Sequence, residues 1–297
     1  MIGRPNVGKS TLINLFVGEK IAIVSKKPQT TRKKSLGILS ASDSQIIFID
    51  TPGIHRPKSK LGDYMVSAAE SVIEDSDVIL FITEPLKLTP HGDKAILKRL
   101  ARVKGQGKKN PPVFLLINKV DTIRKPELLT IIDQYAQLYD FDEIFPISAL
   151  KADNTEPLLD AIKCLMPEGP VFYPTDEPTD MPMRQIAAEI IREKALYYLH
   201  EEIPHGIAVE TLSMKKDEET GKLRLEANIY CEKEQHKKII IGKDGTLLKK
   251  IGTTSRIDIE EMTGEKIFLD LWVKTKKDWR DNLFLLKSFG YDIKKIK

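Results

Sequence analysis

The sequence has few cysteines, no long hydrophobic run and no strong excess of charge of either sign, and each shortage excludes a class of protein. Its two cysteines, Cys164 and Cys231, lie far apart without other metal ligands nearby, which excludes a disulfide framework or a zinc module and predicts buried, reduced thiols. No apolar run approaches the roughly 20 residues of a spanning helix, and no secretory signal opens the sequence. A net charge of only +4 does not by itself indicate a nucleic-acid partner. We therefore expect a soluble, cytoplasmic protein.

The chain is 297 residues long, which is enough for two domains, and residues 1–166 have the pattern of an α/β domain. Short β-branched runs bounded by polar residues predict strands buried on both faces, and they alternate with segments of helical periodicity. We expect a doubly wound, mixed but mostly parallel sheet with a hairpin, Ser35–Ser40 with Gln45–Asp50, at one edge. The predicted strands are Ile46–Ile49, Val78–Ile82, Val113–Ile117 and Ile144–Ile147, and the predicted helices are Leu61–Asp75, Asp93–Val103, Pro126–Leu138 and Pro157–Leu165.

Residues 167–182 interrupt this pattern with five prolines, four acidic residues and no lysine or arginine. Proline at this density disfavours both helix and strand, so we expect an extended linker between domains. Residues 183–297 then predict a second domain with the order α-β-β-α-α-β. Its expected elements are Met183–His200, Ile207–Met214, Leu223–Cys231, Glu234–Ile241, Thr246–Thr263 and Ile267–Val273, followed by a last helix at Asp278–Phe289.

The first residues match the phosphate-binding pattern G-x-x-x-x-G-K-[ST]. In such a loop the backbone N–H groups surround a β-phosphate at the start of a helix, Lys9 reaches the β- and γ-phosphates, and the Ser10 hydroxyl binds Mg²⁺. The simpler alternative is a chance glycine-rich turn. The motif and the residue after it are Gly3, Arg4, Pro5, Asn6, Val7, Gly8, Lys9, Ser10 and Thr11.

Only Met1 and Ile2 precede Gly3, where a complete buried strand ordinarily comes before a phosphate loop. We expect the first strand to be nearly absent, as in a chain truncated at its N-terminus. Weaker nucleotide binding is the expected consequence.

The segment Asp50-Thr51-Pro52-Gly53 follows a predicted strand and has the D-x-x-G pattern. An aspartate at this place holds Mg²⁺, and the Gly53 amide contacts a γ-phosphate. Alone this pattern is weak evidence for a nucleotide site, but it becomes stronger evidence when it follows a phosphate-loop motif in the same chain. The next residue is Ile54, whose apolar side chain cannot orient an attacking water, so slow intrinsic hydrolysis is expected.

Base selection is predicted from Asn118-Lys119-Val120-Asp121, which follows the run Val113–Ile117. The Asp121 carboxylate can accept both the N1–H and the 2-amino group of guanine, and adenine offers neither donor. Leaving that carboxylate unpaired discriminates by a factor on the order of 10⁴. Asn118 is expected to tie this loop to the phosphate loop. Ser148-Ala149 falls where a backbone amide can bind guanine O6.

Together these motifs resemble the translation-factor-related GTPases, a family with a Ras-like fold. The resemblance implies GTP/GDP and Mg²⁺ as ligands, and Lys9, Thr31 and Gly53 as the residues at the reacting phosphate. Thr31, in the segment Pro28-Gln29-Thr30-Thr31-Arg32, is the favoured Mg²⁺ ligand beside Ser10 and Asp50. The alternative is that residues 25–34 are only a solvated basic loop. In several related GTPases an asparagine at the position of Asn6 helps to hold K⁺, which suggests K⁺ as a further cofactor.

In the second domain a G-x-x-G loop lies between two predicted helices. Two glycines allow such a loop to press against a nucleic-acid backbone, and lysines favour its phosphates. The order of elements resembles a type II KH domain. Because basic and acidic residues are nearly balanced there, binding should depend on a local groove. The predicted RNA contacts are Ile241, Gly242, Lys243, Asp244, Gly245 and Lys249.

A Ras-like domain, this linker and a KH domain resemble the Era family of bacterial ribosome-assembly GTPases along the whole chain. The resemblance implies a monomer that binds 16S rRNA near its 3′ end during maturation of the small ribosomal subunit, with peripheral association at the inner membrane. Two alternatives stay open: a nucleotide-gated binding module with negligible turnover, and a second domain that binds only protein. The double-GTPase assembly factors and the tRNA-modifying relatives fit less well, because this chain has one GTP motif set and an intact G-x-x-G.

Overall fold

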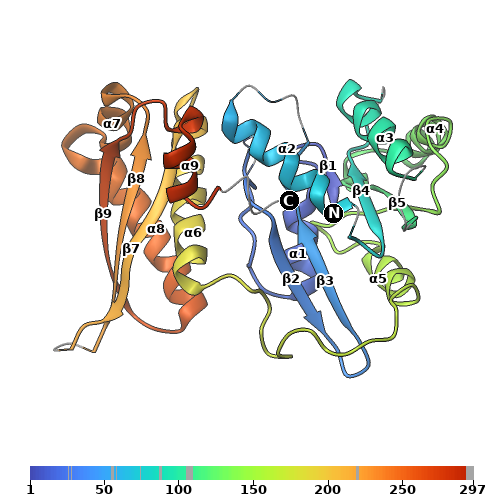
Figure 1. Cartoon of the computed structure of the whole chain (residues 1–297), viewed down its shortest axis with the longest axis horizontal. Helices are drawn as coiled ribbons and strands as arrows, with labels where there is room; N and C mark the ends of the chain where they lie inside the picture. The colour runs from blue at the N-terminus through green and yellow to red at the C-terminus, as the bar shows by residue number, and fades with distance from the viewer. Residues whose placement is uncertain are drawn as a thin grey trace.

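The computed structural model describes residues 1–291 except 26, 28, 55, 56, 58, 74, 87, 88, 105–109, 219 and 220. Within these residues the chain forms an α/β domain and an α+β domain, which lie side by side and are joined by a segment that passes the lower end of a long hairpin (Figure 1). Lys26, Pro28 and residues 292–297, which belong to predicted segments, lie outside the described part.

The first domain is built on four parallel strands in the order β1-β4-β5-β6. Neighbouring side chains of the central strands alternate between two cores, as expected for strands buried on both faces. Leu80 and Phe114 pack with α1 and α5, whereas Phe81 and Leu115 pack with α2, α3 and α4. The elements are β1 (Ile2–Gly3), α1 (Lys9–Val17), α2 (Lys60–Ile73), β4 (Ile79–Thr83), α3 (His91–Lys104), β5 (Val113–Ile117), α4 (Lys125–Ala136), β6 (Glu143–Pro146) and α5 (Thr155–Lys163).

The hairpin pairs β2 (Ser35–Ser40) with β3 (Gln45–Asp50) in the predicted antiparallel register, from Ser35 opposite Asp50 to Ser40 opposite Gln45. It forms a separate two-stranded sheet instead of the edge of one continuous mixed sheet. The physical reason is β1, which has only two residues, as predicted, and pairs with β4. So short a strand cannot carry a ladder on both sides. Isolated hydrogen bonds next to β1 hold the hairpin instead: the Met1 amino group donates to the Ile49 carbonyl at 2.8 Å, and Thr51 Oγ1, just after β3, donates to the Met1 carbonyl at 2.6 Å.

The predicted linker contains neither helix nor strand, and it is fastened to the hairpin. The Gln45 side chain donates to the Tyr173 carbonyl at 2.9 Å and accepts from the N–H groups of Phe172 and Tyr173, both at 3.0 Å. The Ile38 N–H donates to the Pro178 carbonyl at 2.8 Å. These bonds fix the path along which the chain enters the second domain.

The second domain confirms the predicted order α-β-β-α-α-β. Its sheet has the order β7-β8-β9, with β7 and β8 antiparallel and β8 and β9 parallel. Helices α6, α7 and α8 cover one face of this sheet, around a core that contains Ile190, Ile229 and Ile251. The elements are α6 (Met183–Tyr198), β7 (Ala208–Lys216), β8 (Leu223–Cys231), α7 (Glu234–Ile241), α8 (Thr246–Thr263) and β9 (Ile267–Thr275).

Two further sequence predictions were wrong. The predicted helix Asp278–Phe289 is a 3₁₀ turn, Trp279–Asp281, followed by the short helix α9 (Leu283–Ser288). Asn282 separates them, because its side chain accepts from the N–H groups of Phe284 and Leu285 and so begins a new helix. Cys231 is buried as predicted, but Cys164 is exposed at the end of α5.

Helix α2 joins the two domains through a shared apolar cluster. Leu61, Tyr64 and Met65 of α2 pack with Trp279 and Tyr291 of the second domain. The Tyr64 and Tyr291 rings meet edge to face with centroids 5.5 Å apart. No helix in the described ranges is both long and apolar enough to cross a membrane.

Candidate nucleotide and RNA sites

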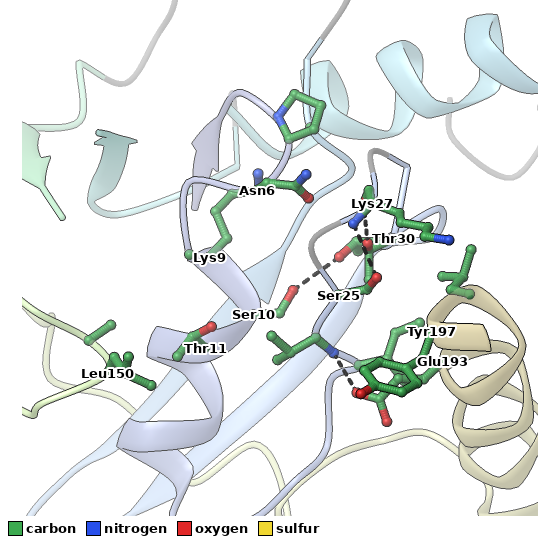
Figure 2. A pocket seen from close by; sticks show the side chains of 18 of the residues that line it. Asn6, Lys9, Ser10, Thr11, Ser25, Lys27, Thr30, Leu150, Glu193 and Tyr197 are labelled. Carbon is green, nitrogen blue, oxygen red and sulfur yellow. Dashed lines mark hydrogen bonds between the residues drawn. The ribbon is translucent and has the colours of Figure 1, made fainter. Parts of the chain in front are cut away.

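A cavity of about 1260 Å³ opens where the phosphate loop, the segment before β2 and the second domain meet (Figure 2). Ligands of parallel α/β sheets bind at the carboxyl ends of the strands, where this cavity lies. Most of the residues predicted to contact nucleotide line it. They are Pro5, Asn6, Gly8, Lys9, Ser10, Thr11, Thr31, Gly53, Asn118, Lys119, Asp121 and Ala149.

The base-selecting loop is locked onto the phosphate loop, as predicted for Asn118. Its Nδ2 donates to the Val7 carbonyl at 2.8 Å, and Lys119 Nζ donates to the Asn6 carbonyl at 2.8 Å. Gly8 has a φ of 104°, and a Cβ atom there would lie 2.1 Å from Asn118 Nδ2. Glycine is therefore required at this position by both the backbone conformation and the close approach of Asn118.

Lys9 lies inside the phosphate loop with an exposed fraction of 5%. Its ammonium group donates to the carbonyls of Arg4 at 2.9 Å and Gly3 at 3.3 Å. Burial lowers its pKa to about 8, although the nearby Asp50 carboxylate acts in the opposite direction. The site thus holds a poorly solvated cation that an anionic phosphate would stabilise.

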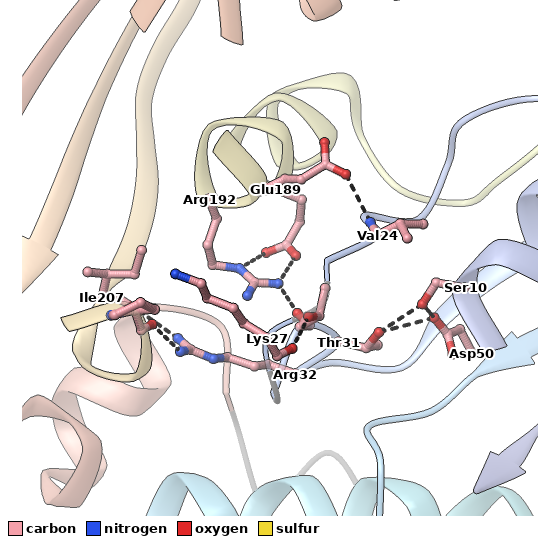
Figure 3. A network of polar contacts seen from close by, with 12 residues as sticks. Ser10, Val24, Lys27, Thr31, Arg32, Asp50, Glu189, Arg192 and Ile207 are labelled. Atoms are coloured by element: carbon pink, nitrogen blue, oxygen red, sulfur yellow. Dashed lines mark hydrogen bonds and ion pairs between the residues drawn. The ribbon is translucent and has the colours of Figure 1, made fainter. Parts of the chain in front are cut away.

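Ser10, Thr31 and Asp50, the three predicted Mg²⁺ ligands, lie together (Figure 3). Ser10 Oγ donates to Asp50 Oδ2 at 2.6 Å, Thr31 Oγ1 donates to the same oxygen at 3.2 Å, and the two hydroxyl oxygens are 3.0 Å apart. The neighbouring Thr30 is turned away, since its hydroxyl donates to the Lys27 carbonyl at 2.6 Å. The geometry therefore favours Thr31 over Thr30.

Asp50 is fully buried, and its second oxygen, Oδ1, has no hydrogen-bond partner. Burial raises the pKa of Asp50, while Lys9 and the hydroxyls of Ser10 and Thr31 oppose that shift. An unsatisfied buried carboxylate oxygen beside two hydroxyls is the oxygen donor set that a hard divalent cation such as Mg²⁺ takes.

Gly53 lines the cavity, but the next residue does not. Ile54 is buried in the core with Ile2 and Ile73, and its N–H donates to the Gly3 carbonyl at 3.1 Å. Its side chain therefore faces away from the phosphate site, in accord with the inference that residue 54 does not orient water.

Asp121 is exposed at the cavity, as a group that reads a guanine edge must be. Ser148 and Ala149 were predicted to offer a backbone amide to guanine O6, but both amides have partners within the protein. The Ala149 N–H donates to Asn118 Oδ1 at 2.9 Å, and the Ser148 N–H donates to the Asp153 carbonyl at 3.1 Å. Leu150, which the sequence did not single out, lines the cavity with an exposed fraction of 76%. A leucine at this place in the sequence does not by itself indicate a binding site. Only the structure shows that Leu150 lines the cavity.

The other predicted residues do not line the cavity; they are Gly3, Arg4, Val7, Asp50, Thr51, Pro52, Ile54, Val120 and Ser148. Arg4 instead supports the phosphate loop. Its Nε forms a 2.9 Å ion pair with the fully buried Asp93, which also accepts from Thr83 and Tyr135. This network fixes the start of the phosphate loop, and burial and the Asp93 carboxylate raise the pKa of Tyr135 well above its usual range.

The second domain contributes part of the cavity wall, which sequence reasoning did not foresee. Glu193, Tyr197 and Asp258 line it from α6 and α8. Lys20 of the first domain reaches across to Glu193 at 2.6 Å and Asp258 at 2.9 Å. More than 170 residues separate Lys20 from its partners, so no local pattern could indicate this contact.

The G-x-x-G loop connects α7 and α8 as predicted. Gly242 and Gly245 both have a φ of 76°, and Lys243 and Asp244 between them are exposed. A Cβ atom on Gly242 would lie 2.8 Å from Leu247 Cβ, whereas Gly245 faces open space. Lys249 is exposed on the first turns of α8, and Ile241 is half-buried against the domain core. Lys243 in the loop and Lys249 on the helix that follows it are thus both exposed.

The same two domains are found in known proteins. Residues 1–119 match the family described as 50S ribosome-binding GTPase, and residues 202–280 match the KH domain. The chain is 52% identical to the GTPase Era of Clostridium kluyveri over 98% of its own length and 97% of that protein. It belongs to the Era family of GTPases. The GTPase Era of Clostridium perfringens is 49% identical over the full chain and 97% of that protein.

Solved structures of Era proteins share this fold over both domains. One is a crystal structure of Era in complex with MgGDPNP and nucleotides 1506–1542 of 16S ribosomal RNA; it has a TM-score of 0.90 and 39% identity, and the match covers 98% of this chain and 97% of that one. A variant of Aquifex aeolicus Era bound to GDP and AlF₄⁻ matches with the same values. The chain is thus an Era-type GTPase along essentially its whole length.

Proposed function

We propose that this Era-family GTPase is a GTP-hydrolysing switch that binds 16S rRNA near its 3′ end and assists maturation of the small ribosomal subunit. One observation carries the proposal. A phosphate-loop site with converging Ser10, Thr31 and Asp50 oxygens and a G-x-x-G loop occur in one chain. That chain matches, over 98% of its length, an Era protein whose crystal contains both MgGDPNP and 16S rRNA.

In this proposal Lys9 and the phosphate-loop amides hold the β- and γ-phosphates, and Asp121 selects guanine. Ser10, Thr31 and Asp50 would hold Mg²⁺, which neutralises charge on the phosphate oxygens during transfer. The Gly53 amide contacts the γ-phosphate. Because Ile54 faces the core, water must be oriented by some other group, and intrinsic turnover is slow.

Asn6 supports K⁺ as a further cofactor of hydrolysis. It has a φ of 66° within the phosphate loop and lines the cavity beside Lys9 (Figure 2). K⁺ held there would supply positive charge next to the transferred phosphate. Turnover that is equal in Na⁺ and in K⁺ rules out this part of the proposal.

We further propose a cytoplasmic monomer that associates peripherally with the inner membrane. The basis is the resemblance to the family. The exposed lysines of the second domain, such as Lys238 and Lys250, are compatible with an anionic surface.

RNA crosslinking followed by sequencing, in the GDPNP and GDP states, tests the proposed partner. The expected result is recovery of 16S rRNA near its 3′ end. Gly245→Asp should abolish the crosslink, because a carboxylate in the open space at this turn repels phosphate. The matched control is Gly264→Asp, since Gly264 has a φ of 67° and equally open surroundings at the far end of α8.

Two results would contradict the proposal. If no rRNA is recovered in either nucleotide state, 16S rRNA is not the partner of this protein. Equal crosslinking by the wild type, Gly245→Asp and Gly264→Asp removes the G-x-x-G loop as the contact and leaves the second domain as a platform for protein.

A further inference from the structure

The segment that carries Thr31 is held on both sides by the second domain. Thr30, immediately before it, accepts a hydrogen bond from Arg192 of α6, and Arg32, immediately after it, extends into the second domain (Figure 3). The Thr31 side chain points the other way, toward Ser10 and Asp50. Both anchors come from residues more than 160 positions away in the sequence.

Arg192 is 1% exposed, although it is one of the most polar side chains in the protein. Its Nη2 donates both to the Thr30 carbonyl and to Glu189, and its Nε donates to Glu189 Oε1 at 3.1 Å. Although burial opposes ionisation, the guanidinium of Arg192 holds the pKa of Glu189 below its usual range. The Glu189 carboxylate thus fixes the plane of the guanidinium, and Nη2 bonds the Thr30 carbonyl as well as Glu189, while Nη1 has no hydrogen-bond partner.

Arg32 is likewise held by the second domain, but here the arginine belongs to the first domain and the carbonyls to the second. It is 2% exposed, and its guanidinium donates to the carbonyls of Ile207 at 2.6 Å and His205 at 3.2 Å. Its Cζ lies 5.7 Å from the centre of the Trp279 ring. A peptide held at residues 30 and 32 leaves little freedom for the residue between them.

We propose that Arg192 is a positioning residue for the Mg²⁺ and γ-phosphate site. It holds the Thr30 carbonyl so that the Thr31 hydroxyl stays within reach of Ser10 and Asp50. The second domain thereby helps to assemble the GTP-specific part of the site, whereas the diphosphate and guanine contacts of Lys9 and Asp121 do not depend on it. This inference rests on the proposed role of Thr31 as an Mg²⁺ ligand.

Arginine is suited to this task and lysine is not. A planar guanidinium can bond a carboxylate and a carbonyl at once in fixed directions, whereas an ammonium is a point charge on a flexible chain. Residues that orient a metal ligand typically cost about 10- to 100-fold in metal affinity or activity when replaced. Arg192→Lys should therefore retain only part of the effect and Arg192→Gln none.

The test measures binding of fluorescent GDPNP and GDP to the full chain while Mg²⁺ is titrated. In Arg192→Gln we expect the Mg²⁺ concentration for half-maximal GDPNP binding to rise about tenfold or more, with GDP affinity in EDTA unchanged. Arg192→Lys should give a smaller rise. Arg184→Gln is the matched control, because Arg184 lies exposed in the first turn of the same helix and should behave as the wild type.

A double-mutant cycle with Thr31→Ala separates positioning from a general structural effect. If Arg192 acts through Thr31, adding Arg192→Gln to Thr31→Ala changes the Mg²⁺ dependence no further. Additive effects, or an equal loss of GDP and GDPNP affinity in Arg192→Gln, overturn the inference. If Arg192→Gln does not fold, Arg192→Lys decides by the same comparison. A wild-type chain that binds neither nucleotide instead refutes the proposed function itself.

Discussion

At the scale of single residues, the site depends on groups that water would otherwise stabilise. Lys9 and Asp50 are buried near each other. The Lys9 ammonium group donates to backbone carbonyls, and one oxygen of the Asp50 carboxylate has no hydrogen-bond partner. Buried groups of this kind mark functional sites more often than structural ones, because they are costly until a ligand arrives. The phosphate loop is therefore arranged for an anion and a metal ion together.

The pKa of Lys9, about 8 before nucleotide binds, predicts how GDP affinity depends on pH. Phosphate binds the protonated amine and raises its pKa in the complex, so affinity is complete below pH 8 and declines above it. We expect the dissociation constant to be constant from about pH 6.5 to 7.5 and to rise by up to about tenfold per pH unit above pH 8. Equilibrium binding of fluorescent GDP across this range measures it.

Lys9→Arg is the control for that measurement. Its guanidinium stays protonated throughout, so any remaining dependence on pH belongs to the base or to other groups. The same slope in both proteins would exclude Lys9 as the titrating group.

At the scale of elements, the linker has no regular structure of its own, yet three bonds from one side chain attach it to the hairpin. Gln45 uses both its amide oxygen and its amide nitrogen, at 2.9–3.0 Å, on Phe172 and Tyr173. A segment without a core of its own opens locally at low cost unless such bonds hold it. Attachment at this point limits how far the second domain can swing.

Gln45→Ala should release the linker without unfolding either domain. Loss of these bonds is worth about 1–3 kcal/mol, so the open state should become roughly 5- to 160-fold more populated. Limited digestion by a glutamate-specific protease after Glu168, which is followed by Gly169, should accelerate to a similar extent. Gln137→Ala, on the exposed end of α4, is the matched control. Equal digestion rates for the two variants would mean that the linker is held by other contacts.

At the scale of the whole molecule, the two domains share a core. Trp279 is fully buried, donates its ring N–H to the Gly206 carbonyl at 2.8 Å, and packs in one cluster with Tyr64 and Met65 of α2. It also lies under the Arg32 guanidinium. One side chain of the second domain thus contacts both helix α2 and the segment that carries Thr31.

Trp279→Ala should lower the free energy of unfolding of the second domain by about 3–5 kcal/mol, because a large side chain leaves a cavity in a packed core. Trp272→Ala is the matched control, since Trp272 is 43% exposed on β9 and should cost less than about 1 kcal/mol. Urea unfolding followed by circular dichroism measures both. If Trp279→Ala lowers the free energy of unfolding no more than the small loss expected for Trp272→Ala, the shared core contributes little to stability.

Much of this arrangement could be predicted from the sequence, because local patterns carry local physics. The segments Gly3–Ser10, Asp50–Gly53 and Asn118–Asp121 each lie at the end of a strand, here β1, β3 and β5. The carboxyl ends of the parallel strands β1 and β5 lie at the same edge of the sheet. The α-β-β-α-α-β order with G-x-x-G between α7 and α8 was equally local. The sequence alone also excluded Ile54 as a water-orienting residue.

Only the tertiary structure decided how the parts meet. Asn282 begins a new helix within a segment whose helical periodicity predicted a single continuous helix. Because β1 has only two residues, the hairpin forms a separate sheet. The hydrogen bond from Arg192 to the Thr30 carbonyl joins residues 162 positions apart. Such contacts arise from packing between surfaces, which no local pattern encodes. Sequence therefore determined the chemistry of each site, and packing determined that the second domain helps to hold the first domain's catalytic segment in place.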